Sequence, residues 1–151
     1  MTPVVERYVP GVLHRIGPVG DGAPLLFDIP RSGHDYPNDF RSPAGFNEVK
    51  SSISMYVNEL FDQAPVHGAT WLFACFPNAY IDANRHESDI DPALVEGTLD
   101  TPFEPTEKSE FGVGLIHRVC DGTGAPLQQL PNRTADLLRR LDGFYWPYHN
   151  E

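Results

Sequence analysis

The chain has 151 residues, of which 40% are hydrophobic and 21% charged, as in ordinary globular domains, so a disordered or fibrous protein is excluded. Its formal net charge of -10 disfavours nucleic acid and anionic membrane surfaces as partners. No apolar run is long enough to span a bilayer and the N-terminus has no signal-peptide pattern, so we expect a soluble, cytoplasmic protein with no membrane partner. Cys75 and Cys120 lie in apolar runs, which predicts buried free thiols rather than a disulfide.

The first half of the chain predicts two strands and a helix. Residues 11–17 alternate apolar and polar positions, which is typical of an edge strand. Residues 24–29 form a continuous apolar run that predicts a buried strand ended by Pro30. An amphipathic helix capped by Asn47 and ended by Pro65 is predicted from the spacing of Val49, Ile53, Val57, Leu60 and Phe61.

The second half predicts two more strands and a final helix. Residues 69–76 are apolar at successive positions and predict a strand in the interior of the sheet. Residues 97–110 read as a surface loop before a third apolar strand at 111–119, and 121–126 as a turn. Residues 131–149 predict a helix whose apolar face contains Leu137, Leu138, Leu141 and Tyr145.

This order of strands and helices predicts one α/β sandwich domain over residues 1–151. Polar side chains follow two of the predicted buried strands. Arg31, Ser32, Gly33 and His34 come after the first, and Asp82, Asn84 and Arg85 come after the second. Ligands bind outside the carboxyl ends of parallel strands, so if these strands are parallel neighbours, both groups face one crevice that forms a binding or active site.

Several blocks together resemble one enzyme family. These blocks are PLLFDIPRSGHDYPNDF, YVNELFDQAPVHGATWLFACFPNAYIDANRHESDIDPALVEG, GVGLIHRV and LLRRLDGFYWPYH. Their order and spacing resemble the N-formylglutamate amidohydrolases. The resemblance implies a three-layer α/β sandwich with a mostly parallel or mixed sheet, similar to zinc carboxypeptidases. It also implies hydrolysis of N-formyl-L-glutamate, or a related N-acyl amino acid, to the amino acid and formate, a step of histidine degradation.

The resemblance also implies site residues and a metal. The block YIDANR matches the Asp-x-Asn-Arg block of the family, and Arg118 matches an arginine after the third strand. A planar guanidinium suits the carboxylates of a small acidic N-acyl amino acid. In the family a divalent metal, zinc, polarises the amide and activates water. The implied substrate-binding residues are Arg31, Ser32, Gly33, Asp82, Asn84, Arg85 and Arg118.

The chain departs from the family pattern at four places. Arg31 stands where the family has the histidine of Pro-His-Ser-Gly, and a guanidinium cannot ligate zinc. Asn58 replaces an acidic residue and Asn78 replaces an arginine. The family continues past the Tyr-His of the last block to a segment with a second histidine ligand, so we expect a truncated member, a possible pseudoenzyme. No catalytic residue is assigned, and His34 is the one candidate metal ligand.

Each candidate also has a structural interpretation. Asp82 and Arg85 are spaced to form a local ion pair, Arg118 to be a solvated charge, and His34 to be an exposed loop residue. Three hypotheses follow. The chain is a hydrolase, alone or completed by a second chain; or a metal-free relative that binds an acidic amino-acid derivative; or an interaction module that pairs through a sheet edge with a partner or a second copy.

Overall fold

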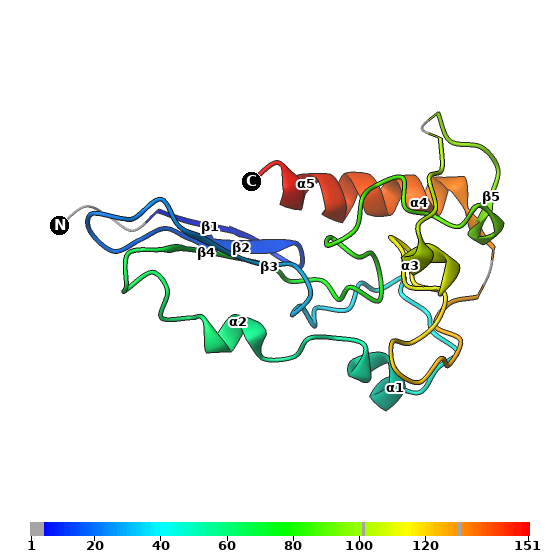
Figure 1. Cartoon of the computed structure of the whole chain (residues 1–151), viewed down its shortest axis with the longest axis horizontal. Helices are drawn as coiled ribbons and strands as arrows, with labels where there is room; N and C mark the ends of the chain where they lie inside the picture. Colours follow the sequence, from blue (N-terminus) through cyan, green and yellow to red (C-terminus); the bar gives the residue numbers. More distant parts are fainter. Residues whose placement is uncertain (1–4, 101, 130) are drawn as a thin grey trace.

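A mixed four-stranded sheet forms one end of the molecule. The computed structural model describes residues 5–100, 102–129 and 131–151. The sheet has the order β1-β2-β4-β3, with bounds β1 Glu6–Val9, β2 Leu13–Ile16, β3 Leu26–Ile29 and β4 Thr70–Ala74 (Figure 1). β2 pairs antiparallel with both β1 and β4, whereas β3 pairs parallel with β4, so that Ile29 lies beside Phe73. The ends of β3 and β4 therefore point in the same direction.

Strand β4 divides the core between the two faces of the sheet. Trp71 and Phe73 pack with Ile29 on one face, toward helix α2 (Val57–Leu60). Leu72 and Ala74 point to the other face and join the main core. This alternation is the period of two that a strand imposes. Figure 1 shows the sheet with the C-terminal helix on one side and α2 on the other.

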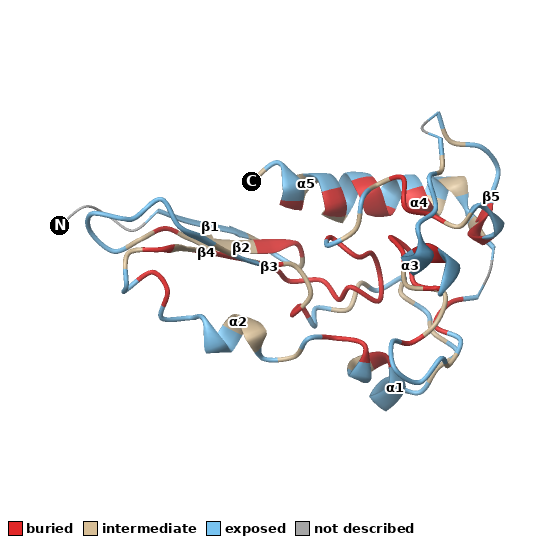
Figure 2. Cartoon of the chain, in the orientation of Figure 1, coloured by how far each residue is buried: buried red, intermediate tan, exposed pale blue. Residues whose placement is uncertain are grey.

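The C-terminal helix supplies much of the main core. It runs through α4 (Thr134–Arg140), the π-helical turn η2 (Leu141–Tyr145) and α5 (Trp146–His149). Figure 2 shows its buried residues on the side that faces the rest of the chain; these are Leu137, Arg140, Leu141, Tyr145 and Tyr148. Within the π turn the N–H of Trp146 reaches back to the carbonyl of Leu141. Pro147 has no N–H to continue the regular ladder, which accounts for the wider turn just before it.

The remaining elements are short and lie around long connecting loops. Helix α1 (Phe46–Ser51) precedes α2, and α3 (Glu107–Glu110) interrupts the long loop before residue 111. The 3-10 turn η1 (Pro92–Leu94) leads into β5 (Val95–Glu96), which pairs in parallel with β6 (Asn132–Arg133). Figure 1 shows α1, α3 and β5 at the end of the molecule away from the sheet.

Two predicted strands exist, but their places in the sheet were wrong. The strand predicted at 11–17 is β2, which lies inside the sheet because β1 forms the edge beyond it. The strand predicted to be buried at 24–29 is β3, at the other edge of the described sheet, where Leu25 and Leu26 are 52% and 53% exposed. The described residues therefore leave Leu25 and Leu26 uncovered, whereas Ile29 is buried.

The long helix predicted from residue 47 was wrong, because two short helices replace it. Helix α1 starts after Gly45 rather than Asn47, and it ends at Ser51. The break between the helices contains Tyr56 at φ 65, which no α-helix accommodates. The backbone N–H of Ser54 binds the carbonyl of Arg31 at 3.0 Å across this break. The segment thus gives up helical bonds for a contact with the loop after β3.

The third strand predicted at 111–119 was also wrong. The segment folds into a buried loop with an isolated bridge between Val113 and His117. Gly112 has φ +86, and a Cβ at Gly114 would lie 2.6 Å from the carbonyl oxygen of Asp89. Leu115 and Ile116 are buried as expected, whereas Phe111 is 74% exposed, and the glycines bend the backbone instead of extending it.

Other predictions agree with the structure. Residues 69–76 contain β4 in the sheet interior, and the final helix exists from Thr134 onward. Leu138 of its predicted apolar face is nevertheless 45% exposed. Cys75 and Cys120 are free and buried, as predicted. In the described part of the chain, no helix has the length and apolar character to cross a membrane.

Candidate functional site

The loops that follow β3 and β4 meet at an ion pair. Arg31 comes directly after β3, and its Nε lies 3.5 Å from Oδ2 of Asp82. The parallel pairing of the two strands is what brings both polar groups to the same edge of the sheet. The other guanidinium end of Arg31 lies 3.6 Å from Oδ2 of Asp121. One arginine therefore spans a fully buried carboxylate and an exposed one.

Asp82 is the centre of this cluster, and it is completely buried. Oδ1 accepts the backbone N–H of Asn84 at 3.0 Å, and Oδ2 lies 2.9 Å from Nε2 of His117. An ionised carboxylate only accepts hydrogen bonds, so Nε2 of His117 is the donor. Nδ1 of His117 has no partner in the described part of the chain. We call Arg31, Asp82, His117 and Asp121 the Arg31 network.

His117 and Asp121 were not predicted as site residues. They follow Asp82 at distances along the chain that have no regular spacing, and residue types alone do not single out either of them. The buried loop at 111–119, which was predicted as a strand, is what carries His117 to Asp82. A contact made by a loop of this kind leaves no periodic pattern in the sequence.

Ser32 and Gly33 hold the loop in place. The Ser32 hydroxyl donates to Oδ1 of Asn58 at 2.6 Å and accepts the Asn58 N–H at 3.1 Å. A Cβ at Gly33 would lie 2.3 Å from the carbonyl oxygens of both Cys75 and Phe76, so only glycine fits against the end of β4. The hydrogen bonds of Ser32 are thus used within the fold, which supports a structural role for both residues.

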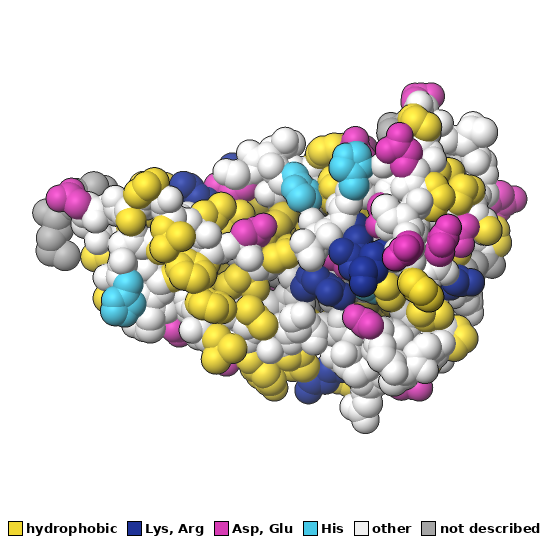
Figure 3. Space-filling view, viewed as in Figure 1, with side chains coloured by type: hydrophobic (Ala, Val, Ile, Leu, Met, Phe, Trp, Pro, Cys, Tyr) yellow, Lys and Arg dark blue, Asp and Glu magenta, His cyan; other side chains and the backbone are white. Residues whose placement is uncertain are grey.

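Arg85 and Arg118 both bind the loop at 110–113. Nε of Arg85 donates to the carbonyl of Val113 at 3.1 Å, and Nη2 of Arg118 donates to the carbonyl of Glu110 at 3.1 Å. The alternative of an ion pair between Asp82 and Arg85 was wrong, since Asp82 pairs with Arg31 and His117 instead. Within the described residues neither Arg85 nor Arg118 makes an ion pair. Figure 3 shows Lys and Arg side chains gathered at the centre of one face.

A cavity of about 350 Å³ opens beside the Arg31 network, at the end of β3. Its polar lining residues are Asp28, Arg31, Ser54 and Asn84, and its apolar ones are Ile29, Pro30 and Val57. Asp28 accepts a hydrogen bond from the hydroxyl of Tyr148. Burial, together with this carboxylate, raises the pKa of Tyr148, so the phenol stays protonated.

His34 lies apart from the Arg31 network. It is exposed, and it lines two neighbouring cavities together with Asn58 rather than the one beside Arg31. Within the described residues, no three His, Cys, Asp or Glu side chains lie close enough to hold a metal ion together. The cationic guanidinium of Arg31 already lies beside both carboxylates and would repel a metal cation there. These residues do not fit a zinc ion at this position, so no catalytic step is assigned to one.

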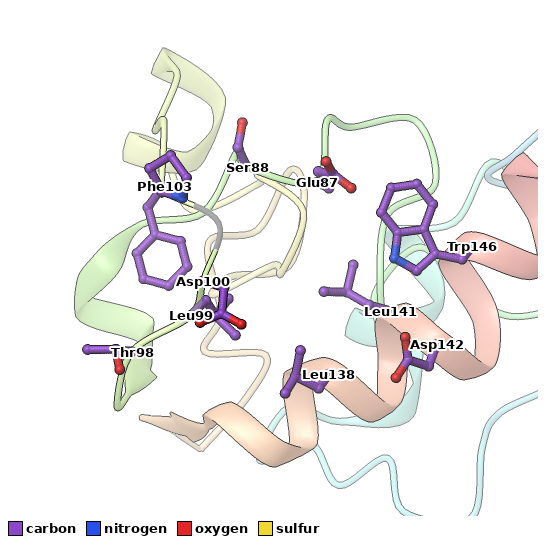
Figure 4. A pocket seen from close by; sticks show the side chains of 11 residues that line it. Glu87, Ser88, Thr98, Leu99, Asp100, Phe103, Leu138, Leu141, Asp142 and Trp146 are labelled. Carbon is purple, nitrogen blue, oxygen red and sulfur yellow. The ribbon is translucent and has the colours of Figure 1, made fainter.

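Another cavity, of about 250 Å³, lies between the loop around residue 100 and the C-terminal helix. Figure 4 shows Leu138, Leu141 and Trp146 on its helical side with Glu87 and Asp142 nearby, and Asp100 lines it as well. Three carboxylates and no Lys or Arg line this cavity. Such a site repels an acidic ligand, so the cavity beside Arg31 is the better candidate for one.

Comparisons with known proteins agree with this geometry. A family model described as N-formylglutamate amidohydrolase matches residues 23–151. The crystal structure of N-formylglutamate amidohydrolase from Ralstonia eutropha JMP134 aligns at a TM-score of 0.87 and 36% identity, over 93% of this chain and 50% of that chain. This chain therefore spans about half the length of that relative. A search of curated proteins finds no match. Since the family model covers most of the sequence, the chain belongs to the N-formylglutamate amidohydrolase family.

Proposed function

We propose that this chain forms the substrate-binding half of an N-formylglutamate amidohydrolase-like enzyme. The ligand would be N-formyl-L-glutamate or a related N-acyl amino acid with an acidic side chain. The observation that carries the proposal is the pair of guanidinium groups of Arg85 and Arg118, which make no ion pair within the described residues and bind one loop. Two carboxylates on the ligand match two such groups.

We assign a separate task to each of three arginines. Arg85 and Arg118 would bind carboxylates through their planar guanidinium groups. Arg31, fixed by buried Asp82, would place a third positive charge beside the acyl group. The reaction breaks the amide C–N bond, adds the oxygen of water to the formyl carbon and leaves the free amine with formate. The groups that activate the water would come from outside the described residues.

The rest of the fold would join the sheet at the β3 edge. The two sheet edges differ, because β1 has the charged residues Glu6 and Arg7 beside Tyr8, whereas β3 has exposed Leu26, preceded by exposed Leu25, and a single charged residue, Asp28. Charged edges resist further pairing, and apolar edges favour it. We infer that the other half of the three-layer, zinc carboxypeptidase-like sandwich adds to β3, supplied by a longer chain, a complementing second chain or a second copy. A cytoplasmic place in histidine degradation follows from the family and is part of the proposal.

A second candidate function is binding without hydrolysis. It is favoured by one observation: the position where the family has a metal-binding histidine holds Arg31, paired with Asp82 and Asp121. A chain of this kind would hold an acidic N-acyl amino acid through its arginines, without metal or turnover. The two candidates make the same prediction for ligand binding and opposite predictions for formate.

One set of measurements tests both candidates. Calorimetry would follow N-formyl-L-glutamate binding, an enzymatic assay would follow formate, and elemental analysis would follow bound zinc. We expect Arg85→Ala and Arg118→Ala each to weaken binding by about tenfold or more, the loss of a charge-assisted contact. Arg133→Ala, at an exposed arginine in β6, is the matched control and should bind like the wild type.

The outcomes separate the hypotheses. Formate release once the other half of the fold is supplied supports the hydrolase, and binding without formate or zinc under the same conditions supports the metal-free binder. If N-formyl-L-glutamate does not bind at all, both proposals are wrong. The chain would then be an interaction module that acts through its β3 edge.

A further inference from the structure

Another arginine, Arg140, is buried and forms no ion pair with an acidic residue of the described chain. Arg140 of α4 is only 7% exposed. Its Nη1 donates to the carbonyl of Tyr80 at 2.7 Å and to Oε1 of Gln128 at 2.9 Å, and its Cζ lies 4.4 Å from the centre of the Tyr80 ring. No ion pair within the described residues includes Arg140. Its hydrogen bonds go to neutral groups, and Asp39 and Asp136 attract its charge only at longer range, although buried charges are normally paired directly.

Two buried donors at this place have no acceptor. Nε of Arg140 and Nδ2 of Asn132 are both buried and lack a hydrogen-bond partner in the described part of the chain. Both residues line the same cavity of about 200 Å³. The other lining residues are Asp39, Arg41, Gln128, Gln129, Asp136 and Arg139. Donors without acceptors, beside a cation that forms no ion pair in the described part of the chain, fit an anion as the missing partner.

The carboxylates of this cavity are already paired with another arginine. Asp39 forms an ion pair with Nη1 of Arg139, and Asp136 lies 3.3 Å from Nη2 of Arg139. Asp39 also accepts the hydroxyl of Tyr80 at 2.9 Å. Burial alone would raise the pKa of Asp39, but the bonds from Tyr80 and Arg139 lower it, so this carboxylate stays ionised. Neither acid forms an ion pair with Arg140, whose guanidinium donates to Tyr80 and Gln128 instead.

We propose that this cavity is a binding site for a small oxyanion, held by Arg140 and Asn132. The cavity is smaller than the about 300–1,000 Å³ typical of drug-sized ligands, which suits a group of a few atoms. A phosphate and a carboxylate share the required chemistry, because both accept several hydrogen bonds around a negative charge. Arg41 lies at the exposed side of the cavity and adds positive charge there. This site is separate from the one proposed for N-formyl-L-glutamate, since Arg85 and Arg118 take no part in it.

Calorimetric titration and thermal unfolding with inorganic phosphate and with acetate, at constant ionic strength, test the proposal. We expect saturable binding of one anion per chain and a melting temperature that rises with its concentration. The anion with the lower Kd identifies whether phosphate or carboxylate is preferred. The absence of saturable binding with both anions would overturn the proposal.

The variant Asn132→Asp supplies the decisive comparison. It places a carboxylate in the cavity, so we expect anion binding to weaken by about tenfold or more while the variant remains folded. Arg140→Lys keeps the charge but loses Nε and the planar fork, and should weaken binding as well. Arg133→Ala serves as the control and should bind like the wild type. Unchanged binding in Asn132→Asp would place the anion elsewhere and contradict the inference.

Discussion

The Arg31 network and the Arg140 cavity each contain an arginine, but the two arginines have opposite kinds of partner. Arg31 lies between two carboxylates, one of which, Asp82, has no exposed surface. Arg140 is more deeply buried and contacts the carbonyl of Tyr80, the amide of Gln128 and an aromatic ring, and it forms no ion pair within the described residues. In the first region the protein supplies the carboxylates that pair with its arginine. In the second it leaves the arginine to pair with an anion from outside the chain.

The two regions are also connected. Gln128 accepts from Arg140 through its amide oxygen and donates through its amide nitrogen to the carbonyl of His117 at 2.8 Å. His117 in turn binds Asp82. One continuous set of buried polar contacts therefore joins the two regions. At one end the arginine is ion-paired, and at the other end it is not.

The largest expected loss of stability follows from removing the carboxylate of Asp82 from the Arg31 network. Asp82→Ala removes the carboxylate from Arg31 and His117 and leaves a partly buried guanidinium and a buried imidazole without a partner. We expect the free energy of unfolding to fall by about 3–5 kcal/mol, as for the loss of one member of a buried ion pair. Urea unfolding monitored by tryptophan fluorescence measures this loss.

Asp121→Asn is the matched control for that change. Asp121 pairs with the same Arg31, but its side chain is 55% exposed. An exposed pair contributes about 0–1 kcal/mol, so the variant should unfold nearly like the wild type. If the two variants lose similar stability, burial does not distinguish the two carboxylates and our comparison fails.

Arg140→Met should cost less than Asp82→Ala. It leaves the carbonyl of Tyr80 and the amide oxygen of Gln128 without a donor, at about 1–3 kcal/mol, but it also removes an uncompensated buried charge. The same unfolding measurement repeated with phosphate present should widen the difference, because only the wild type gains stability from the anion. A loss of stability as large as that of Asp82→Ala would show that Arg140 is as well compensated as Arg31.

Much of the fold was predictable because periodic patterns report on local structure. The interior strand at 69–76 and the helix up to His149 have the alternation or spacing that such elements require. The apparent third strand at 111–119 was misread because apolar content reports burial, and a buried loop shares that content. The helix break at Tyr56 was not predictable either, because long-range contacts such as Ser54 to Arg31 outweigh a continuous apolar spacing.

The candidate site was predictable in part for the same reason. Arg31 and Asp82 each follow a recognisable strand, so their meeting follows from the parallel pairing of β3 and β4. His117 and Asp121 reach the network through irregular backbone that no pattern announces. Arg140 looked like one polar residue of an amphipathic helix, because an arginine in a sequence does not reveal whether an acid faces it.

A smaller loss of stability is expected from removing the hydroxyl of Tyr145, which lies near the Arg31 network. Its hydroxyl donates to the carbonyl of Arg85 at 2.8 Å. Burial, with Glu87 and Asp82 nearby, raises the pKa of Tyr145 to about 12. Its contribution to stability is therefore complete below the ordinary pKa of about 10 and is lost as the pH rises toward about 12. Tyr145→Phe should lose about 0.5–1.5 kcal/mol at neutral pH and show a smaller alkaline loss in urea unfolding.

The smallest expected effect comes from the exposed side of the Arg140 cavity. Asp39 and Arg139 pair at the surface, with side chains 39% and 47% exposed, so Asp39→Asn should cost no more than about 1 kcal/mol at neutral pH. Because the pKa of Asp39 is lowered in the folded state, its contribution is present above the ordinary value of about 3.9 and is lost as the pH falls below it. The unfolding curves of wild type and variant should therefore converge in acid. If Asp39→Asn instead destabilises the chain strongly and also abolishes phosphate binding, Asp39 rather than an external anion compensates Arg140, and the two regions would not differ after all.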